Sequence, residues 1–117
     1  MSFSLKTRKV ENVVIVDLTG KLTIGEPVQQ LRETLRSQVN DGATKFIVNL
    51  GEVSYIDSSG LGELVSSYTT IRNKGGDVKL LKLTTKIKDL LQMTKLLTVF
   101  DSHDDEDKAI KSLKDKP

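Results

Sequence analysis

The spacing of apolar positions along the chain changes between a period typical of strands and a period typical of helices. The run 13–18 is β-branched and nearly all apolar, and 45–50 is similar, so both segments predict buried strands. Between them, residues 26–39 carry apolar side chains at helical spacing, with Pro27 in the first turn. A strand, a helix and a second strand over this length predict a right-handed parallel crossover.

The segments on either side extend this unit. Residues 3–10 alternate apolar with polar positions, which predicts a polar edge strand, and a turn at Glu11 and Asn12 would join it to 13–18 as a hairpin. The other predicted elements are a loop over 19–25, a helix starting within 57–59 and stopping at 73–76, and a strand over 77–83. A short helix capped by Thr84 or Thr85, a short strand within 95–100 and a final helix from Ser102 follow.

These elements predict an α/β fold in a single domain over 1–117, with its core in 3–113 and a short charged C-terminal tail. The expected sheet is mixed but mostly parallel, with about five strands, an antiparallel N-terminal edge hairpin and about four helices.

Composition narrows the class of protein. The chain has 117 residues, of which 37% are hydrophobic and 29% charged, so we expect one soluble globular domain with a modest core. The net charge is only +2 with acids and bases interspersed, which gives no nucleic-acid footprint. The absence of cysteine excludes disulfides, thiolate metal sites and cysteine nucleophiles. Neither a secretory signal nor a bilayer-spanning run is evident, so we expect a cytoplasmic protein with no membrane partner.

The stretch 53–62 is the candidate functional site, because a strand ends and a helix begins there. Asp57, Ser58 and Ser59 all suit the start of a helix, and Gly60 and Gly62 would leave the backbone open to a partner. Free N–H groups and the helix dipole favour an anion at such a position, which suits a phosphorylated serine. The same residues also suit a simple helix cap, and composition alone does not separate the two interpretations.

Enzymatic interpretations find less support. A serine nucleophile needs a base, but the Gly-x-Ser-x-Gly elbow is missing and the only histidine, His103, is expected at an exposed helix start. Gly20 and Gly25 have the spacing of a P-loop, yet Glu26-Pro27 replaces the phosphate-binding pair. The acidic run 104–107 is expected to be a solvated first helical turn rather than a cation site. The sequence therefore predicts neither catalysis nor a cofactor.

The segment Ile56-Asp57-Ser58-Ser59-Gly60-Leu61-Gly62 resembles the Asp-Ser-Ser/Thr-Gly-Leu-Gly signature of the STAS family, specifically of bacterial anti-anti-sigma factors. Supporting matches are Leu18-Thr19-Gly20, Ile47-Val48-Asn49-Leu50, Asn73-Lys74-Gly75-Gly76 and Lys88-Asp89-Leu90-Leu91-Gln92-Met93 followed by Leu96. The resemblance covers nearly the whole chain.

This resemblance implies a non-enzymatic anti-sigma factor antagonist in which Ser58 is the phosphoacceptor. The implied partners are an anti-sigma factor that is also a serine kinase and carries the ATP, and a serine phosphatase that reverses the mark. Unphosphorylated protein would bind the kinase and free the sigma factor. The implied partner-binding residues are Asp57, Ser58, Ser59, Gly60, Leu61, Gly62 and Thr23, the last standing where many relatives have aspartate.

Two alternatives remain. Within the family, the chain is similar to STAS subunits of membrane transporters and of stressosome-type signalling scaffolds, and co-purification with a kinase or with a permease would separate these roles. Outside the family, a small serine hydrolase would react with a serine-directed phosphonate.

Overall fold

One five-stranded sheet organises the molecule, and its strands lie in the order β1-β2-β3-β4-β5 within the described residues 2–114. In this computed structural model the elements are β1 (Ser4–Val10), β2 (Val13–Leu22), α1 (Glu26–Asn40), β3 (Lys45–Ile56), α2 (Ser58–Asn73), β4 (Asp77–Leu81), α3 (Thr85–Met93), β5 (Ser102–His103) and α4 (Glu106–Lys114). The β1–β2 pair is antiparallel and every other pair is parallel. The predicted fold class is confirmed.

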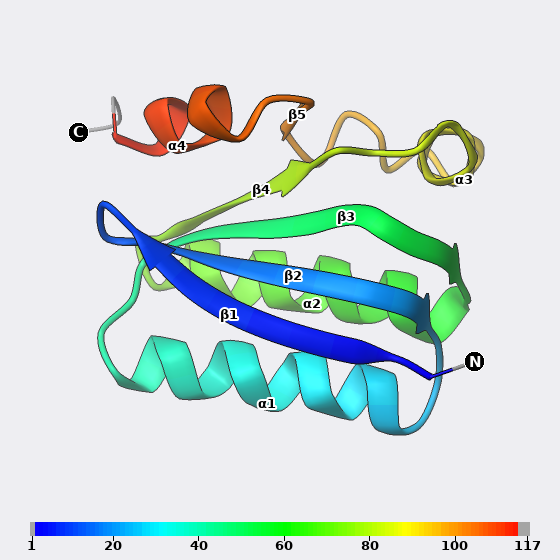
Figure 1. Ribbon diagram of the computed structural model, residues 1–117, viewed down its shortest axis with the longest axis horizontal. Coiled ribbons are helices and arrows are strands. Elements are labelled where there is room, and N and C mark those ends of the chain that lie inside the picture. The colour runs from blue at the N-terminus through cyan, green and yellow to red at the C-terminus, as the bar shows by residue number, and fades with distance from the viewer. Residues whose placement is uncertain (1, 115–117) are drawn as a thin grey trace.

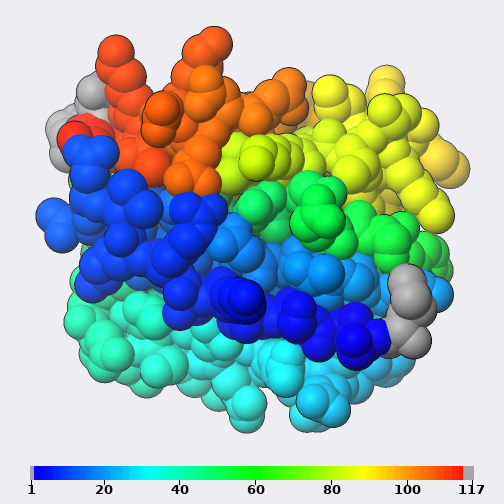
Figure 2. All heavy atoms as spheres, in the orientation of Figure 1, coloured from blue at the N-terminus to red at the C-terminus, as the bar shows by residue number. Residues whose placement is uncertain are grey.

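Helices cover the sheet from both sides. Figure 1 shows α1 and α2 beneath the sheet and α4 above it. Val14 and Val16 belong to the larger core with α1 and α2, whereas Val13 and Ile15 belong to a smaller core with α4. Since successive strand residues point to opposite faces, burial on both faces explains why 13–18 is almost continuously apolar. The edge strand β1, in blue, stays exposed across the front of the molecule (Figure 2).

The turns follow the local chemistry of the sequence. Glu11 and Asn12 take positive φ values of 50° and 70°, which makes the tight hairpin between β1 and β2. α1 begins with Pro27 in its first turn and buries Val28, Leu31 and Leu35 against the sheet. Thr84 caps α3, because its hydroxyl accepts a hydrogen bond from the Ile87 N–H at 3.2 Å.

The predicted loop over 19–25 is partly wrong, because 19–22 continue β2. Register shifts between Asp17 and Thr19 and between Gly20 and Lys21 bend this part of the strand while it stays paired to β3. Of the two glycines in that predicted loop, Gly20 therefore lies inside β2, and only Gly25 lies beyond the strand. The consequence is a longer β2, whose end lies beside the start of α2.

The predicted strand within 95–100 is also wrong. Backbone bonds tie this segment back to α3, with the N–H groups of Leu96 and Leu97 both donating to the Leu91 carbonyl. Leu96, Leu97 and Phe100 pack into the larger core instead, whereas Val99 is exposed. The edge of β4 is paired to β5, so the final helix begins at Glu106 and not at Ser102. The end of the charged tail, residues 115–117, lies outside the described residues.

Candidate functional site

Asp57 fixes the junction between β3 and α2. It is the N-cap of α2, and its carboxylate oxygen Oδ1 accepts a hydrogen bond from the Gly60 N–H at 2.8 Å. The other oxygen, Oδ2, accepts from the Ile24 N–H at 2.9 Å. Hydrogen bonds from two backbone N–H groups lower the pKa of Asp57, with Ile24 contributing most and Gly60 next. The capping group is therefore a carboxylate at neutral pH. One side chain thus joins the loop after β2 to the first turn of α2.

Ser58 is the first residue of α2 and its side chain is exposed. Within residues 2–114, no group forms a hydrogen bond with its hydroxyl. Ser59, which follows it, is half-buried. The hydroxyl of Ser58 therefore lies free at a helix N-terminus, where backbone N–H groups and the dipole favour added negative charge.

The two glycines of the motif have different environments. A Cβ on Gly60 would lie 2.2 Å from the Leu22 carbonyl oxygen, so this buried glycine lets α2 start directly against the end of β2. The expectation that its backbone is open to a partner is wrong for Gly60. Gly62 is exposed, and a Cβ there would have no heavy atom within 4 Å, so Gly62 matches that expectation. Leu61 is buried in the larger core.

Thr23 and Ile24 form the loop beside Ser58. Thr23 is half-buried, and its carbonyl accepts a hydrogen bond from the Val28 N–H at 3.3 Å, which helps to start α1. The side chain of Ile24 is 73% exposed although it is large and apolar. Sequence analysis missed Ile24, because a single isoleucine in a predicted loop carries no periodic signal.

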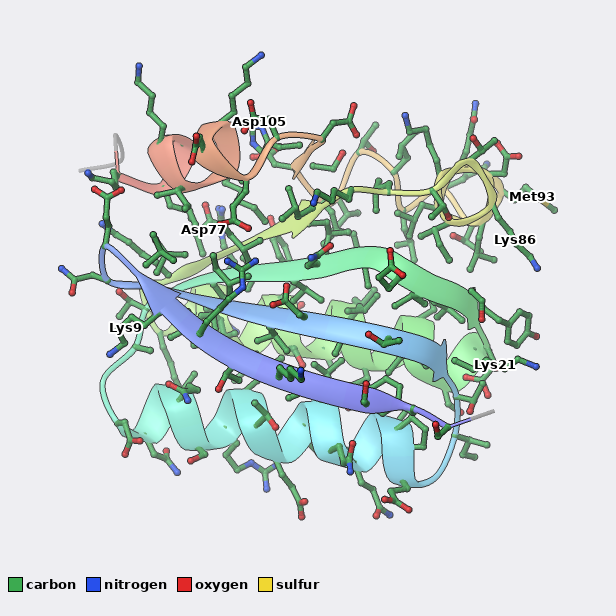
Figure 3. The ribbon with its side chains drawn as sticks, in the orientation of Figure 1. Lys9, Lys21, Asp77, Lys86, Met93 and Asp105 are labelled. Atoms are coloured by element: carbon green, nitrogen blue, oxygen red, sulfur yellow. The ribbon has the colours of Figure 1, made fainter. Side chains whose placement is uncertain are left out.

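Tyr55 adds a second exposed apolar surface next to the motif. Its side chain is 44% exposed, and the Lys86 ammonium lies 5.8 Å from the centre of its ring. Lys21, at the end of β2, pairs in register with Tyr55, and Figure 3 shows Lys21 and Lys86 at the same end of the sheet. Ser58 therefore belongs to an exposed end of the molecule that offers apolar groups and cations.

The other candidate chemistry lies elsewhere. His103 is half-buried in β5, where its carbonyl accepts from the Lys82 N–H at 2.8 Å, so the expected exposed helix start is wrong. Asp104 and Asp105 precede α4, and only Glu106 and Asp107 lie in its first turn. Across residues 2–114, no group of three or more histidine, aspartate or glutamate side chains is placed to hold a metal ion. In the same range, no helix combines the length and the apolar character that crossing a bilayer requires.

The family follows from the whole chain. The STAS domain model matches residues 4–109, which contain the complete sheet and the Asp57–Gly62 turn. The chain belongs to the STAS domain family.

Its relatives within that family include regulators of sigma factors. The chain is 32% identical over 102 residues to the anti-sigma-B factor antagonist of Bacillus subtilis (strain 168), covering 86% of this chain and 91% of that protein. A putative anti-sigma factor antagonist from Thermotoga maritima superposes with a TM-score of 0.87 at 25% identity, with 94% of each chain covered. The Bacillus cell fate determinant SpoIIAA in its phosphorylated form gives 0.71 at 25% identity, covering 95% of this chain and 98% of that one.

Proposed function

We propose that this protein is an anti-sigma factor antagonist whose binding is switched off by phosphorylation of Ser58. The unphosphorylated form binds an anti-sigma factor that is also a serine kinase, and the sigma factor is released. The kinase supplies the ATP, a serine phosphatase restores the free hydroxyl, and the cytoplasm is the place of action. The observation that carries the proposal is the exposed Ser58 hydroxyl on the first residue of α2, held next to Ile24 by Asp57.

The local structure suits reversible phosphorylation of Ser58. A phosphoryl group on Ser58 would lie at the positive end of the α2 dipole, where the Gly60 N–H is already bonded to Asp57, so the dipole rather than a set of free N–H groups helps the fold to tolerate the modification. The free hydroxyl needs no internal bond to be broken before a kinase can reach it. The likeness to a protein whose structure is described in a phosphorylated form supports the same role.

The switch acts on the docked partner rather than on the fold. Ile24 and Tyr55 offer exposed apolar surface near the motif, and a partner that covers them would also remove water from Ser58. Phosphorylation adds about −1.5 to −2 charges at neutral pH, which such a contact would have to desolvate. A loss of about 3 kcal/mol of binding free energy weakens affinity by more than about a hundredfold, which is enough for a switch.

A pull-down with the purified cognate anti-sigma kinase tests this function. Wild type and Ser58→Ala should both retain the kinase in the absence of ATP, and Ser58→Asp should not. With ATP, wild type should release the kinase whereas Ser58→Ala should stay bound. Equal retention of Ser58→Asp and wild type would contradict the proposal.

A further inference from the structure

A groove runs between α1 and α2 and starts at the phosphoacceptor turn. Two adjoining hollows share Arg32, Arg36, Glu63 and Ser66. The hollow nearer the start of α2 also reaches Ser59, and the hollow nearer its end reaches Lys74. They therefore form one continuous surface, here called the α1–α2 groove and defined by these six residues. Its two walls lie on the same side of the sheet (Figure 1).

The acidic side chain that lines this groove, Glu63, is paired with neighbouring side chains of the same protein. Glu63 is only 6% exposed, and the guanidinium of Arg32 lies 2.9 Å from its Oε1. The Ser67 hydroxyl donates to the other oxygen, Oε2, at 2.8 Å. Both carboxylate oxygens of Glu63 thus have partners on the protein, and the pair with Arg32 leaves little net charge for a ligand.

The free charge of the groove is positive. Arg36 and Lys74 are both exposed, and no carboxylate among residues 2–114 forms an ion pair with either. Between them the floor is apolar, because Leu35 and Ile71 line the groove and are buried beneath it. A ligand must therefore match two cations and an apolar floor at the same time.

The α2 wall keeps this floor accessible. Gly62, Ser66 and Thr70 follow one another at helical spacing on the exposed side of α2, and all three line the hollows. No long side chain from these positions covers the groove, and a Cβ on Gly62 would meet no heavy atom within 4 Å. A peptide segment can approach both helices closely there.

We infer that the α1–α2 groove binds an acidic segment of the anti-sigma factor that also carries apolar side chains. The inference rests on the proposed function and extends the partner surface from Ser58 to the far end of α2. Two free cations and a net charge of +2 are too few for a nucleic-acid footprint, whereas the apolar floor suits a protein segment.

This arrangement explains why a phosphate would act so strongly. Ser59 lines the groove and Ser58 directly precedes it, so a phosphoryl group on Ser58 adds its charge at the entrance. Its charge of about −1.5 to −2 would repel an acidic segment at this entrance, within the screening length of about 8 Å, whereas Lys74 at the other end of α2 lies well beyond that length. The state of Ser58 thus acts on binding at the entrance of the groove, and Lys74 contributes at the far end.

Charge reversal tests the inference on the intact protein. Arg36→Glu, Lys74→Glu and the double variant are titrated by calorimetry with the purified anti-sigma factor at low and at high salt. Lys108→Glu is the matched control, because Lys108 is an exposed lysine on α4, on the other face of the sheet. The double variant should bind about tenfold or more weakly at low salt, less so at high salt, with the control unchanged.

The outcomes separate this inference from the proposed function. If the double variant binds like wild type while Ser58→Asp does not bind, the groove is not a partner surface and the proposed function stands. If wild type binds no anti-sigma factor, both are overturned. Wild type and the double variant are also tested against duplex DNA and anionic vesicles. If only the double variant loses such binding while its anti-sigma binding stays intact, the groove belongs to another ligand and the inference is overturned. Thermal unfolding of each variant checks that the fold is retained.

Discussion

The carboxylate of Asp57 accepts a hydrogen bond from the backbone N–H of Ile24 at 2.9 Å, across 33 residues of sequence. The same carboxylate caps α2 through the Gly60 N–H. Because the cap and the loop share one side chain, the exposed Ile24 and the exposed Ser58 are held in a fixed relation. The helix cap and the proposed docking surface are therefore parts of one structure, and the two interpretations of the motif are compatible.

Asp57→Ala should weaken partner binding by more than its effect on stability explains. Loss of the cap should lower the free energy of unfolding by about 1 kcal/mol. Asp105→Ala is the control, since Asp105 accepts from the Asp107 N–H at the start of α4, on the other face of the sheet. Urea unfolding and calorimetry with the anti-sigma factor measure both effects. Equal affinities in the two variants would show that Asp57 does not position the docking surface.

Ile24→Ala should reduce affinity and leave stability unchanged. The side chain is 73% exposed, so its removal takes almost nothing from the core. An apolar anchor in an interface contributes about 1–2 kcal/mol or more, so the dissociation constant should rise about fivefold to thirtyfold. Titration of the anti-sigma factor measures this change. An unchanged constant would place the partner away from the loop after β2.

Gly60→Ala and Gly62→Ala should have opposite effects on stability. The new methyl group at position 60 would lie 2.2 Å from the Leu22 carbonyl oxygen, so overpacking should cost about 1–3 kcal/mol. At position 62 there is open space, and alanine should stabilise the helix by about 0.5–1 kcal/mol. Urea midpoints of the two variants decide the matter. Similar midpoints would mean that β2 and α2 do not approach each other as closely as described.

Stability should fall in acid because of an ion-pair network on the α4 side of the sheet. Arg8 contacts Asp17 at 2.7 Å and Glu106 at 2.6 Å, which joins β1, β2 and α4. The hydrogen bonds from Arg8 lower the pKa of both carboxyl groups. A lowered folded-state pKa contributes stability above the unfolded value of about 4, and this is lost as pH falls through the folded value.

Arg8→Met should remove this pH-dependent part of the stability. These groups are partly exposed, so the loss at pH 7 should be only about 1 kcal/mol. The difference from wild type should shrink as the pH falls below the unfolded value of about 4 and through the lowered folded-state pKa values, because the carboxyl groups then become protonated in both states. Lys9→Met, an exposed lysine on the same strand, is the control. Urea unfolding at several pH values measures the difference, and a gap that does not change with pH would contradict the network.

The fold was largely predictable because local pattern and tertiary burial agree. The run 13–18 is apolar at every position that the two cores require, and α1 shows its buried stripe directly. The pattern failed at 95–100, where Leu96, Leu97 and Phe100 serve the core without forming a strand. Hydrophobicity reports burial, whereas strand pairing depends on which backbone reaches the free edge of β4.

The candidate site was predictable only in its local part. Asp57 and Ser58 stand together in sequence, so the cap and the exposed hydroxyl could be inferred from the motif. The contact of Gly60 with Leu22, and the bond from Ile24 to Asp57, join distant segments. No local pattern encodes such contacts, because they depend on how far β2 continues before α1 begins.

The most direct test of the central claim is the affinity of stoichiometrically phosphorylated protein for its anti-sigma factor. Kinase-treated protein is mapped by mass spectrometry, separated from unmodified protein and titrated by calorimetry beside it. The phosphate should lie on Ser58, and the phosphorylated form should bind more than about a hundredfold more weakly. Equal affinity of the two forms, or a phosphate on another residue, would contradict the account.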